Sequence, residues 1–262
     1  TSRIAHVGAQ ELYVYTEPAS NMPANSVSAK ITGHLVGSEK LYGNSSARLM
    51  PEVQVGISKK FMFRIGTTFS NMHNADFRYE SWNVYAKYRF LSNDDIHTHF
   101  RMAAYAEGSS TRSPFHYEEI NLMGDKSGVQ VGLVATQLWH KFALSGNFSH
   151  SQVLDESRNN DVIYIPRRLY QSLNYSLSAG YLILPKEYTS YKQTNLNIYL
   201  ELLGERSLDA KKYCLDMAPS LQLIFNSNTR LNLGTRFQLA GNMSRMSLNS
   251  WQISLERSFL GA

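Results

Sequence analysis

Ser149, His150 and Ser151 are the residues of this sequence whose types could support nucleophilic catalysis. That chemistry needs a serine hydroxyl within hydrogen-bond reach of a histidine base. The three residues lie in a segment that alternates apolar and polar positions, which predicts a β-strand. Neighbouring residues of a strand point to opposite faces, so neither serine is well placed against His150. We therefore predict no catalytic residue and no enzymatic activity.

His97 and His99 have the spacing that places two side chains on one face of a strand, as a metal site could require. The sequence offers no third ligand nearby, and solvated polar residues at a turn explain the pair better. Cys214 is the only cysteine, so neither an internal disulfide nor a Cys-x-x-Cys zinc motif is available. We predict no metal and no cofactor.

The composition indicates a structured chain that differs from an average soluble domain. Of 262 residues, 18% are charged, against about 25% in a typical domain, and 12% are aromatic. The longest apolar run, Met102 to Ala106, is far shorter than the roughly 20 residues of a transmembrane helix. A helical membrane protein and a disordered chain are both excluded. The 26 basic residues exceed the 21 acidic ones but form no clustered basic stripe, so we expect no nucleic-acid partner.

From residue 26 onward the sequence reads as successive strands with two unlike faces, preceded by an N-terminal segment over residues 1–25. Apolar residues alternate with small or polar ones, which is the period of a strand. No convincing amphipathic helix interrupts this pattern. Twelve strands are predicted, over residues 26–37, 46–58, 61–72, 78–90, 97–109, 128–139, 142–154, 170–185, 194–206, 213–226, 229–241 and 248–260.

Connections of two lengths alternate along most of the chain. Tight connections are expected at 59–60, 91–96, 140–141 and 226–229, and longer ones at 38–45, 71–78, 110–127 and 155–170. The segment 186–193 is an exception, because it is long for a turn. Outer-membrane barrels alternate short periplasmic turns with longer external loops and have an even number of strands. The pattern therefore favours an all-β, antiparallel, up-and-down transmembrane barrel over residues 26–260, rather than a soluble sandwich.

The two faces of the predicted strands differ as those of a membrane barrel do. One face is apolar, with aromatic residues near the strand ends, and the other carries Ser, Asn, Gln, Gly and single charges. In one segment the apolar face comprises Leu49, Pro51, Val53, Val55 and Ile57, and the polar face Glu52, Gln54, Gly56 and Ser58. The apolar face is expected to contact outer-membrane lipid, and the polar face to line the lumen.

Three turn-then-strand phrases, at 60–66, 141–146 and 229–234, repeat one hairpin pattern, and Trp251, Ile253, Leu255 and Phe259 alternate with polar residues in the last strand. The last strand resembles the terminal β-signal of outer-membrane barrels, although Gly261 and Ala262 follow it. The phrases resemble Gram-negative outer-membrane barrel transporters of the phenol-degradation-pathway-like type. The resemblance implies a barrel in the bacterial outer membrane and assigns no solute.

Inward-facing charges are the candidate functional residues. Those on the early strands are mainly basic and those on the late strands mainly acidic: Lys30, Glu52, Arg64, Lys87, Arg89, Arg101, Glu107, Glu201, Asp216, Arg236 and Glu256. In an up-and-down barrel these groups lie on opposite walls. They either create a field across a solute path or form ion pairs in a plugged lumen, since a charge in a narrow interior needs a partner. The sequence leaves both interpretations open.

Three further expectations concern closure and gating. Lys30 and Glu256 are expected to meet across the seam between the first and last strands. The segment 11–20 contains a short β-like run that would enter the lumen or lie along the periplasmic rim, with a loose tail as the other possibility. The loops 110–127 and 155–170 would gate or cover the external mouth.

The leading hypothesis is a passive channel or transporter for small polar solutes. An alternative is a closed barrel that serves as a structural or accessory subunit of an outer-membrane complex, recognised through its loops by protein partners. A weaker alternative is an outer-membrane phospholipase-like hydrolase built around His150. The His-x-Ser-Asn-Gly pattern of those enzymes is absent from the sequence.

Overall fold

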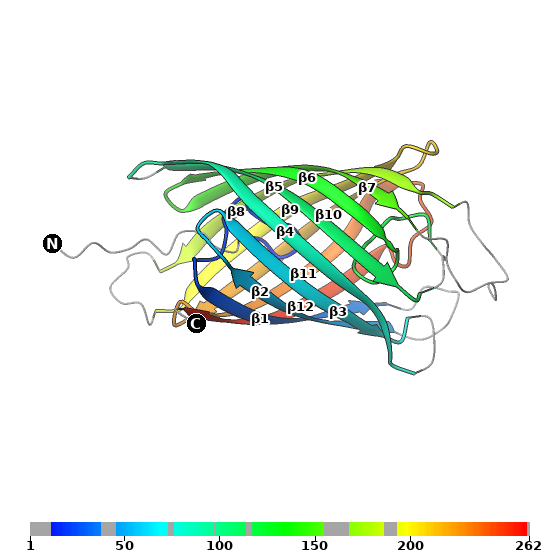
Figure 1. The fold of residues 1–262 in the computed structure, drawn as a ribbon, viewed down its shortest axis with the longest axis horizontal. Helices are drawn as coiled ribbons and strands as arrows, with labels where there is room; N and C mark the ends of the chain where they lie inside the picture. The colour runs from blue at the N-terminus through cyan, green and yellow to red at the C-terminus, as the bar shows by residue number, and fades with distance from the viewer. Residues whose placement is uncertain are drawn as a thin grey trace.

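The computed structural model describes residues 12–37, 46–72, 76–96, 98–113, 117–154, 168–185 and 193–260. Within these residues, antiparallel strands form one closed barrel, in which each strand pairs with its neighbours in sequence and the last pairs with the first (Figure 1). The strands are β1 (Ser26–Val36), β2 (Ser46–Gly56), β3 (Phe61–Ser70), β4 (Arg78–Asp94), β5 (Thr98–Thr111), β6 (Gly128–Trp139), β7 (Phe142–Val153), β8 (Gln171–Leu184), β9 (Asn195–Ser207), β10 (Tyr213–Phe225), β11 (Thr229–Gly241) and β12 (Asn249–Leu260). The predicted fold class, strand number and strand order are confirmed.

The seam between β1 and β12 has the predicted register. Ser26 is opposite Leu260, and Lys30 is opposite Glu256. Lys30 Nζ also lies 3.7 Å from a carboxylate oxygen of Glu52 on β2, while Arg230 NH1 on β11 donates to Glu256 at 2.9 Å. Lys30 and Glu256 are thus opposite each other in the register, and each has an ion-pair partner on its other neighbouring strand.

The hairpin of β4 and β5 is longer than predicted, because the segment 91–96 was expected to be a turn. Pairing continues from Leu91 to Asp94, opposite Met102 to His99, after a bulge between Arg89 and Leu91. The β4 side of this extension is exposed and mainly polar, and the β5 side is half-buried. Backbone pairing persists beyond the apolar belt, where hydrophobic alternation is no longer needed, so the sequence pattern missed it.

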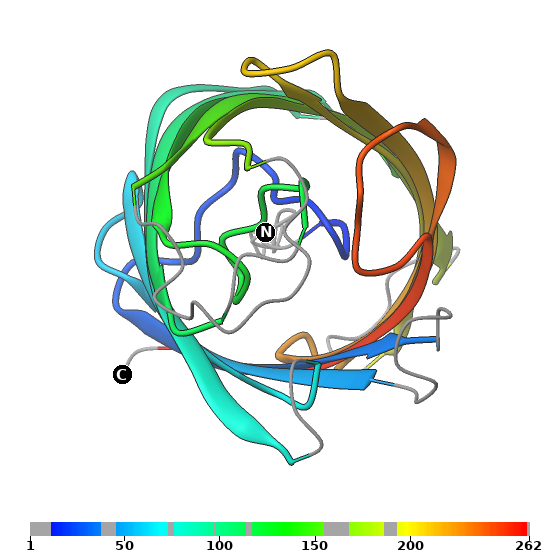
Figure 2. The same ribbon diagram turned by 90° about the vertical axis from the view of Figure 1, so that its right-hand side faces the viewer.

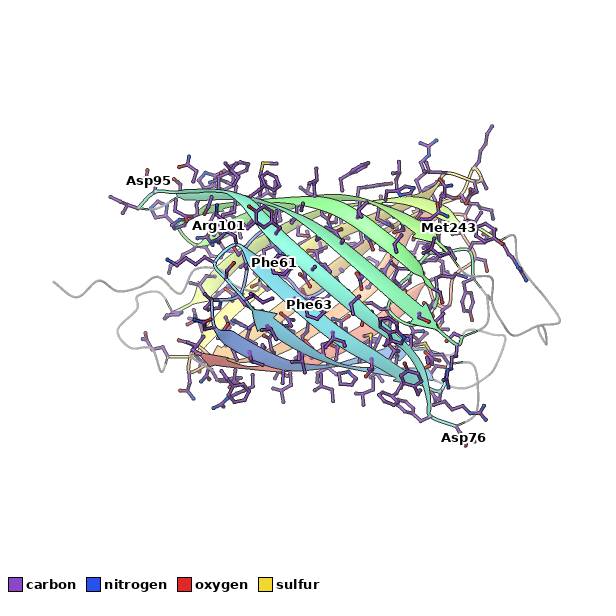
Figure 3. All side chains as sticks on the ribbon, in the orientation of Figure 1. Phe61, Phe63, Asp76, Asp95, Arg101 and Met243 are labelled. Carbon is purple, nitrogen blue, oxygen red and sulfur yellow. The ribbon has the colours of Figure 1, made fainter. Side chains whose placement is uncertain are left out.

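The outer surface of the barrel is apolar and exposed. Ile65, Leu133 and Leu255 are each about half exposed, on strands far apart around the wall. Figure 3 shows side chains covering this surface, with Phe61 and Phe63 on β3 labelled among them. Exposed aromatic residues gather near the strand ends, including Tyr79, Trp82, Tyr88, Phe90, Trp139, Phe142, Tyr181, Phe225, Trp251 and Phe259. A continuous apolar belt between aromatic girdles is the surface that a bilayer requires.

Buried side chains inside the barrel are mainly polar or charged. Lys87, Glu201 and Glu256 are among the largest fully buried side chains. Apolar residues pack inside at a few places, such as the cluster of Ile120, Val153, Leu169, Cys214 and Met243. Twelve strands enclose more space than wall side chains alone fill, so other parts of the chain enter the lumen.

The two ends of the barrel differ in their connections. The ranges 57–60, 95–97, 140–141 and 226–228 join strands at one end, called here the short-turn end, and the longer ranges 37–45, 71–77, 112–127 and 154–170 join them at the long-loop end. Asp95 and Asp76, labelled in Figure 3, mark these two ends. The range 185–194 is the long exception at the short-turn end. No helix within the described ranges is long and apolar enough to cross a membrane.

Candidate functional site

Two parts of the chain occupy the lumen. The N-terminal segment, residues 12–25, runs inside the wall before β1 begins, and part of the connection between β5 and β6, residues 117–127, folds inward from the long-loop end. Figure 2 shows both within the ring of strands, the first in blue and the second in green. We call them the N-terminal segment and the lumen loop. The sequence left open whether residues 11–20 enter the lumen, lie along the periplasmic rim or form a loose tail. The structure describes this segment from residue 12 onward, and the described part lies in the lumen.

Glu201 on β9 anchors the N-terminal segment. Its fully buried carboxylate accepts hydrogen bonds from the backbone N–H groups of Val14, Tyr15 and Thr16 at 2.8–3.0 Å, and from the Thr16 hydroxyl at 2.7 Å. The Tyr13 ring packs edge-on against Tyr199 of the same strand, with ring centroids 5.3 Å apart. A buried carboxylate needs such donors, and here the four shortest hydrogen bonds all come from one short segment, with a longer one of 3.4 Å from the Ser178 hydroxyl of β8.

Glu17 ties the same segment to the opposite part of the wall. Its carboxylate forms ion pairs with Arg64 on β3 and, at 3.3 Å, with Lys87 on β4. The Lys87 ammonium also donates to the Pro18 carbonyl at 3.0 Å. With Glu201 on β9, these contacts fix the segment across the lumen rather than along one wall.

The barrel wall has space for the N-terminal segment. A Cβ at Gly234 on β11 would come within 2.7 Å of the Tyr15 ring, and one at Gly56 on β2 would overlap the Pro23 carbonyl. The Ala19 N–H and the Ser20 hydroxyl bond to Thr136 and Arg101 of the wall at 2.8 and 3.0 Å. The fit between segment and wall extends over several strands.

A four-residue ion network holds the lumen loop. Glu119 of the loop accepts hydrogen bonds from Arg236 on β11 at 3.0 Å and from Arg245 in the β11–β12 connection at 2.8 and 3.0 Å. Asp216 on β10, fully buried, contacts the same two arginines at 2.5–2.7 Å. Two carboxylates facing two guanidinium groups give a neutral cluster whose members are all hydrogen-bonded.

Further contacts secure the loop from other sides. Asp125 pairs with the buried Arg48 of β2, and Glu118 lies 2.9 Å from Lys212. Gly124 adopts φ +115°, where a Cβ would also meet Arg48 at 3.1 Å, so a residue without a side chain is required there. The lumen loop is therefore bound to both sides of the barrel interior.

A cavity of about 310 Å³ lies between the two lumen elements. Val14 to Glu17 bound it from the N-terminal segment and Glu119 to Met123 from the lumen loop. Its wall carries cationic, anionic, amide and tyrosine side chains, among them Lys30, Glu52, Arg64, Tyr85, Tyr105, Glu107, Gln130 and Arg236. Arg64 lies over the Tyr85 ring at 4.4 Å, and Tyr85 stacks with Tyr105 at 5.4 Å. The cavity is polar and large enough for a small solute.

The candidate residues from the sequence divide among several ion-paired groups. Lys30, Glu52, Arg64 and Lys87 belong with Glu17; Asp216 and Arg236 belong with Glu119; Glu256 pairs with Arg230; and Glu201 binds the N-terminal segment. Arg101 lies 3.0 Å from Asp94, Glu107 accepts from Asn83 at 2.9 Å, and Arg89 is partly buried near the β4 bulge. Charges of opposite sign thus pair mainly with near neighbours and with the two lumen elements, rather than facing each other across open space.

Several residues of these networks were missing from the sequence prediction. Arg48, Glu205 and Arg230 share the inward faces already identified, at even spacing from predicted residues, so the same alternation could have found them. Glu80 lies at an odd spacing from Lys87 and is buried because the register of β3 and β4 shifts at this residue, which alternation does not predict. Glu17, Glu119 and Arg245 lie outside the strands. No periodic signal marks such positions, because their place in the lumen depends on contacts with residues far away in sequence.

The residues considered for catalysis or metal binding are separated or lie outside the described ranges. Ser149 is buried and accepts a hydrogen bond from Gln130 at 2.6 Å, whereas His150, the next residue of the strand, belongs to the opposite face. His97 lies outside the described residues, and His99 lies 3.0 Å from Asp94. Of the loops expected to gate the mouth, 155–167 also lies outside the described residues.

Two of the carboxylates that hold the lumen elements, Glu17 and Glu119, are strongly acidic. Burial alone would raise the pKa of Glu17, but Arg64 and then Lys87 outweigh it and lower the pKa from 4.5 to about 2. Burial would likewise raise the pKa of Glu119, but Arg236 and Arg245 outweigh it and lower the pKa to about 2. Both groups are therefore ionised throughout the neutral and mildly acidic range.

These lowered pKa values predict how the lumen responds to acid. A carboxylate with a depressed pKa in the folded state stabilises its contacts above its ordinary pKa, and this stabilisation is lost as pH falls toward the folded value. We expect single-channel conductance in a planar bilayer to stay constant from about pH 7 to about pH 5 and to rise only below about pH 4. Glu17→Gln should weaken that acid-induced rise. A rise centred near pH 6 would contradict the prediction.

Neither a protein-family model nor a curated protein sequence matches this chain. Several solved structures are similar to it in fold. An outer membrane channel from Pseudomonas putida F1 superimposes with a TM-score of 0.59 at 11% identity, over 94% of this chain and 100% of that one. The β domain of the Bordetella autotransporter BrkA gives 0.51 at 11% identity, over 90% and 100%. The KdgM porin gives 0.47 at 11% identity, over 88% and 99%. The first two similarities show that the chain has the fold of outer-membrane β-barrels, to which a channel and an autotransporter domain both belong.

Proposed function

We propose that this protein is a passive channel for small polar solutes in the bacterial outer membrane, held in a resting state by the N-terminal segment and the lumen loop. The observation that carries the proposal is the polar cavity between these two elements, enclosed by a barrel whose outer surface is apolar. The outer surface supports a place in lipid, and the polar interior supports passage of a hydrated or hydrogen-bonding solute. In this proposal the residues of the lumen bind or exclude the solute, and none acts as a catalyst.

The two lumen elements give the proposed channel a gate at each end. The N-terminal segment depends on Glu17 and Glu201, and the lumen loop depends on Glu119 and Asp125. Neither element contributes a strand to the wall. Within the described ranges, backbone hydrogen bonds join them to β2 and to the residue after β7 only at their ends, at Asn25 and Ser127, so each can move without breaking a strand pair. The resemblance of the hairpin phrases to the phenol-degradation-pathway-like transporters supports a transport role and leaves the solute open.

A second candidate function is a closed barrel that acts as an accessory subunit of an outer-membrane complex. The ion pairing of the lumen favours it, because Arg64, Asp216 and Glu256 are all buried and each forms an ion pair inside the barrel. Such a barrel would bind protein partners through its loops. Partners that remain bound during purification in detergent, together with a silent bilayer recording, are the result expected for this alternative.

Planar bilayer recording distinguishes the channel from the accessory subunit. We expect the intact chain to give rare, small conductance steps and a variant lacking residues 1–21 to give steps several-fold larger. Circular dichroism would verify that both are folded β-barrels. A folded variant without residues 1–21 that conducts no ions would overturn the channel proposal.

A further inference from the structure

The basic residues around Glu17 form a site that matches a carboxylate in charge and geometry. Arg64 is 3% exposed and directs its guanidinium at the Glu17 carboxylate, and the Lys87 ammonium lies 3.3 Å from the other Glu17 oxygen. Arg64 and Lys87 belong to the rigid wall, on β3 and β4, whereas Glu17 belongs to a segment that is held only by side-chain and end contacts. The site therefore exists independently of the carboxylate that now occupies it.

The charge balance of this part of the lumen depends on Glu17. Lys30, Arg64 and Lys87 supply three positive charges, and Glu17, Glu52 and Glu107 supply three negative ones. Glu52 is a weaker partner of Arg64 than Glu17, because its oxygen lies 3.6 Å from Arg64 Nε. That Nε atom is buried and has no hydrogen-bond partner among the described residues. When Glu17 leaves, the wall keeps one excess positive charge and an unsatisfied guanidinium donor, which favours an anion in its place.

The site is reached from the cavity. Glu17, Lys30, Glu52 and Arg64 all line the cavity of about 310 Å³, so a solute held there faces the same guanidinium that binds Glu17. A glutamate side chain beyond its Cα is chemically a propionate group. The segment thus presents to the wall a group with the shape and charge of a small organic acid.

We propose that Arg64 and Lys87 form a carboxylate-recognition site, and that a small organic carboxylate passing through the barrel binds there by displacing Glu17. The proposal rests on the channel function proposed above and specifies its solute class. Binding of the solute removes one attachment of the N-terminal segment to the wall and leaves those at Glu201, Thr136 and Arg101. Solute entry and opening at the short-turn end are coupled in this way, because both use the same cationic groups.

Binding of propionate by the detergent-solubilised full chain, measured by isothermal titration calorimetry, tests the site itself. Propionate is the probe because it reproduces the Glu17 side chain, and propionamide is its uncharged match. In Glu17→Ala we expect propionate to bind at least about 10-fold more tightly than propionamide, since a charged hydrogen bond contributes about 1.5–3 kcal/mol. Adding Arg64→Gln to Glu17→Ala should abolish this preference.

Glu119→Ala is the matched control. It removes a carboxylate that also faces two arginines, but Asp216 still contacts both of them, so propionate should not bind preferentially there. Glu17→Gln, which keeps the side-chain length, serves if the alanine variant folds poorly, and it should retain a smaller preference for propionate. Equal binding of propionate and propionamide in both Glu17 variants, or unchanged binding after Arg64→Gln, would overturn the proposal.

Reversal potentials in a bilayer separate this inference from the channel function. Under a potassium chloride gradient, Glu17→Ala should be more anion-selective than the unaltered protein and should lose that selectivity when Arg64→Gln is added. Propionate binding in a barrel that never conducts would support the site and contradict the channel. If the barrel conducts but no variant prefers propionate over propionamide, the channel proposal stands and the carboxylate-recognition site is contradicted.

Discussion

Glu201→Gln should raise the open fraction of the barrel by about 10- to 100-fold. The Glu201 carboxylate accepts four hydrogen bonds from Val14, Tyr15 and Thr16 through its two oxygens. A glutamine replaces one of these oxygens with an NH2 group, which cannot accept hydrogen bonds from the groups that donate to Glu201. Each charge-assisted bond contributes about 1.5–3 kcal/mol, so the loss of one is enough for an effect of this size. Single-channel recording would measure the fraction of time that the lumen conducts.

Glu256→Gln is the matched control for this variant. Glu256 is as deeply buried as Glu201 and also lies in the lumen, but its partners Arg230 and Ser28 belong to the wall. Its replacement should lower stability without changing the open fraction. If the two glutamine variants conduct alike, the N-terminal segment does not close the lumen through Glu201.

Asp216→Asn should produce the largest loss of stability among single lumen substitutions. Asp216 is fully buried between Arg236 and Arg245, and without its charge the two guanidinium groups share only Glu119. Removing one partner from a buried ion network typically costs about 3–5 kcal/mol. Urea unfolding, followed by tryptophan fluorescence in detergent micelles, would show a transition at clearly lower urea concentration.

An exposed ion pair supplies the comparison for Asp216. Asp94 also pairs with an arginine, Arg101, at 3.0 Å, but its side chain is 42% exposed at the short-turn end. Asp94→Asn should therefore cost less than about 1 kcal/mol, because water screens such a pair. Similar losses for the two variants would mean that the Asp216 network contributes little to holding the lumen loop.

The alternation of the sequence predicted the wall of this barrel well. Leu255 and Ile65 lie on the outer face and Glu52 and Glu201 on the inner one, as their positions in the pattern require. The strand ends agree within a few residues except at β4, where pairing extends to Asp94 beyond the apolar belt. Alternation is a local property, since every second residue of a strand meets the same environment.

The partners of the lumen charges could not be predicted in the same way. The sequence suggested basic and acidic walls facing each other, but Arg64 pairs with Glu17, from a segment 47 residues earlier in the chain. Arg236 pairs with Glu119, which is 117 residues away. Such pairing depends on which segment fills the lumen, and the charges of the wall alone are compatible with several arrangements.

The sequence by itself determined the closed barrel, its strand order and the division between lipid-facing and lumen-facing residues. These features follow from period-two alternation and from short connections between neighbouring strands. The tertiary structure alone decided that the N-terminal segment and the lumen loop enter the barrel, and that Glu17, Glu119 and Arg245 complete its ion networks. The physical reason is that a buried charge must find a partner wherever the fold brings one within reach, and that reach is set by three-dimensional closure rather than by spacing along the chain.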